Sequence, residues 1–146
     1  MGAKAQLALG FDFGLRRIGI AGGDTLTRNA SPLATVAHSD SGPDWAAIDR
    51  HVKSYGPNLM VVGSPYNDDG SPGKLAAAAD AFAQALAQRY GLAVARADER
   101  YSSTEASSLL REQRAAGLRR RRVAKGDIDS AAAAILLASW LQQQRG

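Results

Sequence analysis

The sequence predicts an α/β domain on a mixed five-stranded sheet, with three antiparallel strands followed by parallel units and helices on both faces. Short β-type segments near the N-terminus are joined by short turns, which is typical of antiparallel pairs. Further along, apolar segments of strand length alternate with segments of helix length, which is typical of parallel crossover units. The chain has 146 residues, 45% of them apolar. This size and composition indicate one domain over residues 1–146 with a substantial core.

The antiparallel part of the sheet is expected first along the chain. Residues 6–12 are apolar enough for a strand that is buried on both faces, and residues 14–17 form a turn. Residues 18–23 form a second strand, which is antiparallel to the first because the connection is short. Residues 32–36 are a short third strand on the edge side.

The rest of the chain alternates between helices and strands. Asp44 can cap a helix that Gly56 and Pro57 end, and Gly91 can end a later helix as its C-cap. In the last helix, apolar residues recur at helical spacing, at Ala132, Ile135, Leu136 and Trp140. We expect helices over 44–55, 74–90 and 127–144, a further helix from Ser103 or Thr104, strands over 59–63 and 92–97, and loops over 64–73 and 117–122.

The composition excludes several kinds of site. The chain has no cysteine, which excludes disulfides, zinc–thiolate sites and cysteine nucleophiles. Its two histidines, His38 and His51, lie in no motif, so neither a histidine triad nor a histidine-rich metal site is expected. No apolar run is long enough for a membrane span, and the N-terminus lacks the apolar core of a signal peptide. We therefore expect a cytoplasmic protein with no membrane partner.

Basic residues are concentrated in one stretch of the chain. The formal net charge is +4, and residues 96–125 carry nine basic against four acidic residues, a local excess of +5. Such a stretch favours phosphate contacts, which bind nucleic acid without reading its sequence and weaken with salt. The candidate nucleic-acid contacts are Arg100, Arg119, Arg120, Arg121, Arg122 and Lys125 in this stretch, and Arg16 and Arg17 in the first turn.

Three separated acidic motifs are expected to meet at one edge of the sheet. Asp12 ends one expected strand, Asp98 and Glu99 end another, and Asp129 lies near the start of the last helix. Carboxylates that converge there would repel one another unless a divalent cation, Mg²⁺ or Mn²⁺, lay between them. In a basic protein this pattern indicates metal-assisted attack on a phosphodiester.

The acidic motifs also have ordinary structural interpretations. Asp12 could be a turn aspartate. Adjacent strand residues point to opposite faces, so only one of Asp98 and Glu99 is expected to bind metal, and the residues alone leave that choice open. Asp127 fits a helix-capping role better than Asp129 does.

Small residues near the acids favour close approaches. Gly10 and Gly14 would let a phosphate backbone approach Asp12. Ala132 and Ala133 would let the last helix approach the sheet, which would direct the Asp129 carboxylate into the crevice. The loop before the second helix is either an ordinary helix entry or a phosphate-binding loop, with Asn67, Gly70 and Ser71 as its candidate contacts.

Five segments of the chain match one family pattern in the same order. They are Gly-Phe-Asp-Phe-Gly-Leu-Arg-Arg-Ile-Gly-Ile-Ala (10–21), Ala-Ser-Pro-Leu (30–33), Val-Val-Gly-Ser-Pro-Tyr-Asn-Asp-Asp-Gly-Ser (61–71), Asp-Glu-Arg-Tyr-Ser-Ser-Thr-Glu-Ala (98–106) and Lys-Gly-Asp-Ile-Asp-Ser-Ala-Ala-Ala (125–133). Together they resemble the YqgF/RuvX group of Holliday junction resolvases, within the RNase H-like superfamily. The resemblance implies an RNase H-like fold and a metal-dependent nuclease, with Asp12, Glu99 and Asp129 as catalytic metal ligands; Asp98 is kept as the alternative to Glu99. Mild departures from the family pattern at 22–24, 64 and 102–103 remove no carboxylate.

The resemblance implies two roles: resolution of branched DNA and processing of the 5′ end of precursor 16S ribosomal RNA. Structured RNA or branched DNA is thus the implied partner. The protein could be a monomer or a homodimer, and symmetric cleavage of a four-way junction would favour the dimer. A second interpretation is a non-catalytic ribosome-assembly factor that binds nucleic acid. The glycine-flanked Asp12 also resembles the phosphate motif of actin-like ATPases, but 146 residues are too few for their two domains.

Overall fold

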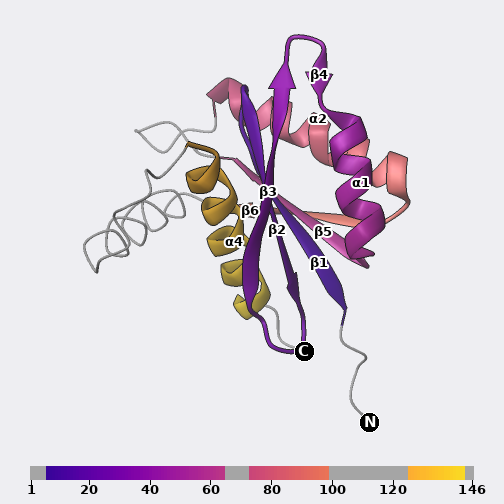
Figure 1. Cartoon of the computed structure of the whole chain (residues 1–146), viewed down its shortest axis with the longest axis vertical. Helices are drawn as coiled ribbons and strands as arrows, with labels where there is room; N and C mark the ends of the chain where they lie inside the picture. Colours follow the sequence, from indigo (N-terminus) through magenta and orange to yellow (C-terminus); the bar gives the residue numbers. More distant parts are fainter. Residues whose placement is uncertain (1–5, 65–72, 99–124, 144–146) are drawn as a thin grey trace, which may run out of the picture.

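The computed structural model describes residues 6–64, 73–98 and 125–143, and this part of the chain forms a mixed six-stranded sheet with helices on both faces (Figure 1). The strands lie in the order β4-β3-β2-β1-β5-β6. The predicted α/β class and the two helical layers are confirmed. The elements are β1 Leu7–Phe13, β2 Arg17–Asp24, β3 Ala30–Ser39, β4 Gly42–Pro43, α1 Trp45–Tyr55, β5 Leu59–Ser64, α2 Gly73–Tyr90, β6 Ala93–Asp98 and α4 Lys125–Gln143.

The strand directions agree with the expected topology. β1 pairs antiparallel with β2 and parallel with β5, and β5 pairs parallel with β6. The three parallel strands therefore end at the same edge of the sheet. In this register Asp12 lies opposite Gly63, and Gly63 lies opposite Ala97, the residue before Asp98.

The edge beyond β2 differs from the prediction. The expected third strand over 32–36 is the middle of a longer strand, β3, and Ser39 and His38 at its end pair with Gly42 and Pro43 of β4. Within the described ranges the sheet thus has six strands rather than five. A glycine–proline pair is typical of a turn, and two residues show no alternation of apolar and polar side chains, so Gly42 and Pro43 carry no strand signal.

Helix ends follow the expected capping chemistry. The Asp44 side chain accepts a hydrogen bond from the backbone N–H of Ala47 at 3.2 Å. Gly56 and Gly91 both adopt a φ of +67° just after their helices. Their N–H groups donate to the carbonyl groups of Val52 and Ala87, each at 2.9 Å, which satisfies helix-end acceptors.

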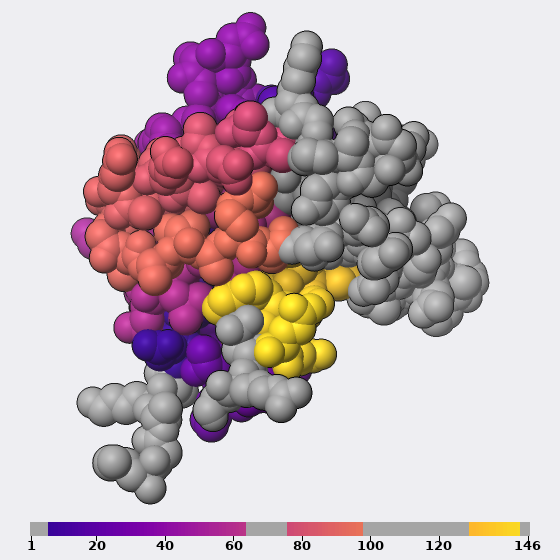
Figure 2. Space-filling model, turned by 180° about the vertical axis from the view of Figure 1, so that it is seen from behind, coloured from indigo at the N-terminus to yellow at the C-terminus, as the bar shows by residue number. Residues whose placement is uncertain are grey.

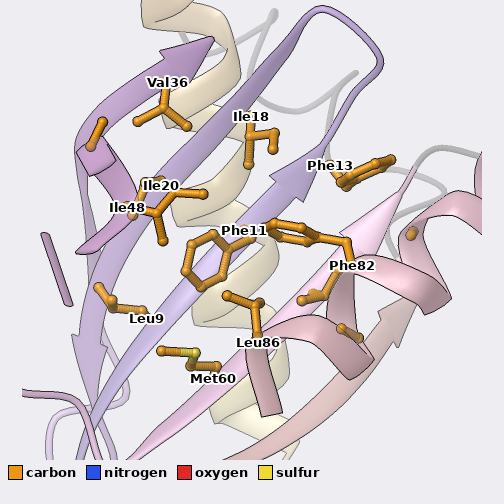
Figure 3. Packing of buried hydrophobic residues seen from close by; sticks show 14 residues of the cluster. Leu9, Phe11, Phe13, Ile18, Ile20, Val36, Ile48, Met60, Phe82 and Leu86 are labelled. Carbon is orange, nitrogen blue, oxygen red and sulfur yellow. The ribbon is translucent and has the colours of Figure 1, made fainter. Parts of the chain in front are cut away.

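The face of the sheet under α1 and α2 carries the larger core. Phe11 of β1 and Phe82 of α2 are 0% and 4% exposed, and their rings meet edge to face with centroids 5.6 Å apart. Ile48 of α1 and Leu86 of α2 are fully buried in the same cluster (Figure 3). Burial stabilises the fold by about 1.5–3 kcal/mol for each such side chain.

The opposite face is covered by α4, which also lies beside β6 at the surface (Figure 2). Ala133, Leu137 and Leu141, spaced four residues apart, pack on Ala8 and Val61 of the sheet. Ala132 packs instead with Ile135 in a separate cluster. The sheet-facing stripe is therefore offset by one position from the spacing noted in the sequence. The helix is apolar around most of its circumference, so periodicity could not select the face. None of the helices in the described ranges combines the length and hydropathy of a membrane span.

An ion pair joins α1 and α2 at the surface. Arg89 donates from Nε to Oδ1 of Asp49 at 2.8 Å and from a terminal amino group to Oδ2 at 2.6 Å. Tyr90 donates its hydroxyl to the same carboxylate. The Arg89 guanidinium also lies 4.9 Å from the centre of the Trp45 ring. The bond from Arg89, followed by that from Tyr90, lowers the pKa of Asp49 from 3.8 to about 2.

We expect this carboxylate to contribute to stability in acid. The pKa of Asp49 is lower in the folded than in the unfolded chain, so its contribution is present above about pH 4 and is lost as the pH falls to about 2. Asp49→Asn should therefore flatten the decline of the urea midpoint over that window, modestly because both side chains are 43% exposed. Asp40→Asn, at an exposed loop residue, is the control. Parallel profiles for the wild type and Asp49→Asn would contradict this expectation.

Candidate functional site

Asp12 lies near the end of the central strand β1. Its neighbours Phe11 and Phe13 belong to the core under α1 and α2, so strand alternation directs Asp12 to the α4 side. Its register partners in the adjacent strands are Gly19 of β2 and Gly63 of β5. Neither partner carries a side chain, and Asp12 is partly exposed. Asp12 therefore lies between two glycines at the edge where the parallel strands end.

Asp129 reaches the same place from α4, as the fifth residue of that helix. Its backbone carbonyl packs directly on Gly19, where an added Cβ would lie only 2.0 Å from the carbonyl oxygen. Gly19 is also the register partner of Asp12. Because Gly19 has no side chain, the start of α4 can pack over β2 beside Asp12. Sequence reasoning missed this residue, although a glycine inside a strand is a known signal of close backbone approach.

Arg17 is the ionic partner of Asp129. Its Nε donates to Oδ2 of Asp129 at 2.5 Å, with the Arg17 and Asp129 side chains 40% and 24% exposed. Charge-assisted hydrogen bonds of this kind are stronger than those between neutral groups. The sequence had indicated Arg17 as a phosphate contact. In the structure its guanidinium binds an acid of the candidate site, while the neighbouring Arg16 is exposed in the turn.

The turn that carries Arg17 is held by β3. His38 donates its backbone N–H to the carbonyl of Arg16 at 3.0 Å, and its ring Nδ1 lies 2.7 Å from the carbonyl oxygen of Gly14. The His38 ring also packs against Phe13, with centroids 5.1 Å apart. His38 therefore has a structural position beside the site, which its lack of a sequence motif did not indicate.

Gly10 and Gly14, on either side of Asp12, allow a close helix contact and a tight turn. A Cβ on Gly10 would lie 2.8 Å from Cβ of Leu137, and a Cβ on Gly14 would lie 2.7 Å from the carbonyl oxygen of Arg17. The absence of a side chain at Gly10 therefore lets α4 pack closely on β1, and the absence of one at Gly14 allows the tight turn into β2. The expectation that both keep space for a phosphate backbone is wrong, because protein atoms fill that space.

The acidic motif of Asp98 and Glu99 is described only in part. Asp98 is the last residue of β6 and pairs with Ser64, one register step beyond the level of Asp12. The described ranges hold no group of three side chains suited to a metal ion.

Lys125 is the first residue of α4, whereas the expected start of that helix was Asp127. Outside the described residues lie Glu99, Arg100, Arg119, Arg120, Arg121, Arg122, Asn67, Gly70 and Ser71, together with the helix expected from Ser103 or Thr104.

Comparison with known proteins gives one family and one fold. A family model described as "RuvX: Holliday junction resolvase" matches residues 6–143. A protein of Coxiella burnetii (strain RSA 493 / Nine Mile phase I) named "Putative pre-16S rRNA nuclease" is 42% identical over 139 residues, covering 95% of this chain and 94% of its own. One of the same name from Nitrosococcus oceani is 41% identical over 143 residues, covering 98% of this chain and 91% of its own.

Solved structures with low sequence identity share the fold. T. thermophilus RuvC in complex with Holliday junction substrate superimposes with a TM-score of 0.55 at 14% identity, over 96% of this chain and 98% of that chain. The fowlpox virus Holliday junction resolvase gives a TM-score of 0.54 at 12% identity, over 94% of this chain and 99% of its own. The predicted RNase H-like fold is therefore confirmed.

Proposed function

This chain belongs to the RuvX family of Holliday junction resolvases, a nuclease family, and from that membership we propose that it is an endonuclease that depends on Mg²⁺ or Mn²⁺. The observation that supports the proposal is the packing of the Asp129 backbone on Gly19, the register partner of Asp12, which brings two acids from distant parts of the chain to one edge of the sheet. A carboxylate pair in a chain of net charge +4 suits a reaction at phosphate.

The donor set fits a hard divalent cation. Asp12 and Asp129 offer carboxylate oxygens, the ligands that Mg²⁺ and Mn²⁺ prefer. Asp129 already binds a cationic group, the guanidinium of Arg17, at 2.5 Å. We propose Asp12, Asp129 and Glu99 as the metal ligands, with Asp98 as the alternative to Glu99. A bound ion would supply an activated water and stabilise charge on the leaving oxygen.

The protein's own contribution is to hold the acids in place. Asp12 lies on a central strand whose neighbours on both sides are hydrogen-bonded to it, so its backbone has little freedom. Asp129 is held by the contact of its carbonyl with Gly19 and by Arg17. Preorganisation of this kind lowers the cost of assembling charged groups at the moment of reaction. The basic residues of 96–125 would bind the flanking phosphates.

We favour precursor 16S ribosomal RNA as the substrate, cleaved at its 5′ end. The relatives at 41–42% identity carry the name of a pre-16S rRNA nuclease, whereas the structures of junction resolvases share only the fold at 12–14% identity. Branched DNA is the second candidate substrate, suggested by the family description. An rRNA precursor would also agree with the cytoplasmic location expected from the sequence.

The proposed activity is tested by offering both substrates to the purified protein. A precursor 16S rRNA 5′ leader and a four-way DNA junction are incubated separately in Mg²⁺ and in Mn²⁺, with and without EDTA. We expect the RNA to be cut at one position, in a reaction that EDTA stops. Cleavage of the junction alone would overturn the choice of RNA. Salt-sensitive binding of both substrates without cleavage would support a non-catalytic assembly factor instead.

A further inference from the structure

The pair between Arg17 and Asp129 lies inside the proposed metal site, and the proposed function gives Arg17 no role there. We propose that Arg17 is the resident counter-ion of Asp129: it occupies the place of a divalent cation at this carboxylate and thereby sets the affinity of the site for Mg²⁺ or Mn²⁺. The inference rests on the proposed function, because it concerns the same site.

Asp129 has little freedom to move away from Arg17. Its carbonyl oxygen occupies the position beside Gly19 that any larger residue would fill. The next residue, Ser130, is only 8% exposed, and Ala133 one turn later is fully buried against the sheet. The start of α4 is therefore fixed, and the carboxylate can change partners only by rotation of its own short side chain.

Arg17 is fixed in its backbone and adjustable in its side chain. Its Cα lies opposite Ala37 in β3, and the turn before it is held by the two contacts of His38. Its hydrogen bond to Asp129 is made by Nε, whereas Arg89 donates two hydrogen bonds to the Asp49 carboxylate. At 40% side-chain exposure, the guanidinium can leave Asp129 by rotating into solvent, with no change in the strand.

Arg17 and a divalent cation are alternative partners of the Asp129 carboxylate because both are positively charged. A guanidinium and a divalent ion at one carboxylate oxygen would lie a few ångströms apart, where two positive charges repel strongly at the border of the protein. Metal binding at Oδ2 therefore requires Arg17 to move away from this oxygen. The free energy of the Arg17–Asp129 pair opposes metal binding, so the site is expected to fill only at a higher ion concentration than the carboxylates alone would need.

The test is a titration of the whole protein with Mn²⁺ by calorimetry, without nucleic acid. Arg17→Gln should bind Mn²⁺ about tenfold more tightly than the wild type, which corresponds to about 1.4 kcal/mol. Arg16→Gln removes the same charge from the adjacent, exposed residue and should change the affinity by less than about twofold. Arg17→Lys keeps the charge at position 17 and should also stay within about twofold of the wild type.

Thermal unfolding gives a second measurement on the same proteins. Without metal, Arg17→Gln should melt at a lower temperature than the wild type, because Asp129 loses its counter-charge. Saturating Mn²⁺ should raise its Tm by more than it raises the Tm of the wild type, because tighter binding gives a larger shift. An equal or smaller rise in Arg17→Gln would speak against the counter-ion role.

The outcomes separate this inference from the proposed function. Equal or weaker Mn²⁺ binding by Arg17→Gln would overturn the counter-ion role, as would equal tightening in Arg17→Lys or in Arg16→Gln. If the wild type binds Mn²⁺, Asp12→Asn does not, and Arg17→Gln matches the wild type, only this inference fails. If wild type and Asp12→Asn show no difference in Mn²⁺ binding, the proposed metal site fails and this inference fails with it.

Discussion

Asp12→Asn is expected to abolish phosphodiester cleavage while the fold is kept. Asparagine has nearly the same shape as aspartate, but it lacks the negative charge that holds a divalent cation. Loss of a ligand on the central strand β1 should slow cleavage by about three orders of magnitude or more, equivalent to about 4 kcal/mol of transition-state stabilisation. The measurement is the single-turnover rate on whichever substrate the wild type cleaves.

The control for this variant separates chemistry from stability. Asp40→Asn makes the same change at an exposed loop residue and should cleave at the wild-type rate. Urea unfolding and circular dichroism of Asp12→Asn should match those of the wild type closely enough to establish a folded protein at the assay temperature. A folded Asp12→Asn variant that still cleaves within about tenfold of the wild type would exclude the proposed mechanism.

Gly19→Ala is expected to disrupt the docking of α4. The added Cβ would lie 2.0 Å from the carbonyl oxygen of Asp129, so the backbone of either the strand or the helix has to move. Overpacking against backbone should lower the free energy of unfolding by about 3 kcal/mol or more. Any folded fraction should bind Mn²⁺ more weakly, because Asp129 is displaced from Asp12. Urea unfolding and calorimetry would measure the two effects.

Gly91→Ala is the matched control for this second variant. Gly91 has a φ of +67°, and an added Cβ would have no atom within 4 Å, so the substitution costs only backbone strain of roughly 1–2 kcal/mol. Its Mn²⁺ affinity should equal that of the wild type. If Gly19→Ala and Gly91→Ala had the same stability and the same affinity, close packing at Gly19 would not matter.

Features set by neighbouring residues could be predicted from the sequence. The cap of α1 at Asp44 and the end of that helix at Gly56 follow from residues within a few positions, and the structure confirms both. The direction of β1, β2 and β5 followed from the lengths of their connections. From these directions alone it was possible to place Asp12 at the edge where the parallel strands end.

Features set by distant contacts could not be predicted in the same way. Arg17 and Asp129 are 112 positions apart, and no local pattern states where the start of α4 falls on β2. Gly19, between Ile18 and Ile20, was an available signal of close approach, but it does not identify the element that approaches. The role of Glu99 stays a prediction, because that residue lies outside the described part of the chain.

The docking of α4 on β2 also governs when the site can exist. Asp12 belongs to the first strand of the sheet, and Asp129 belongs to α4, which follows every strand along the chain. During synthesis, β1 and its neighbours leave the ribosome before Asp129 has been made. At that stage the nascent chain carries Asp12 without Asp129, so the arrangement of these two residues at Gly19 has not yet formed. The order of the elements therefore places the assembly of the proposed site at the end of synthesis, when α4 can pack on the sheet.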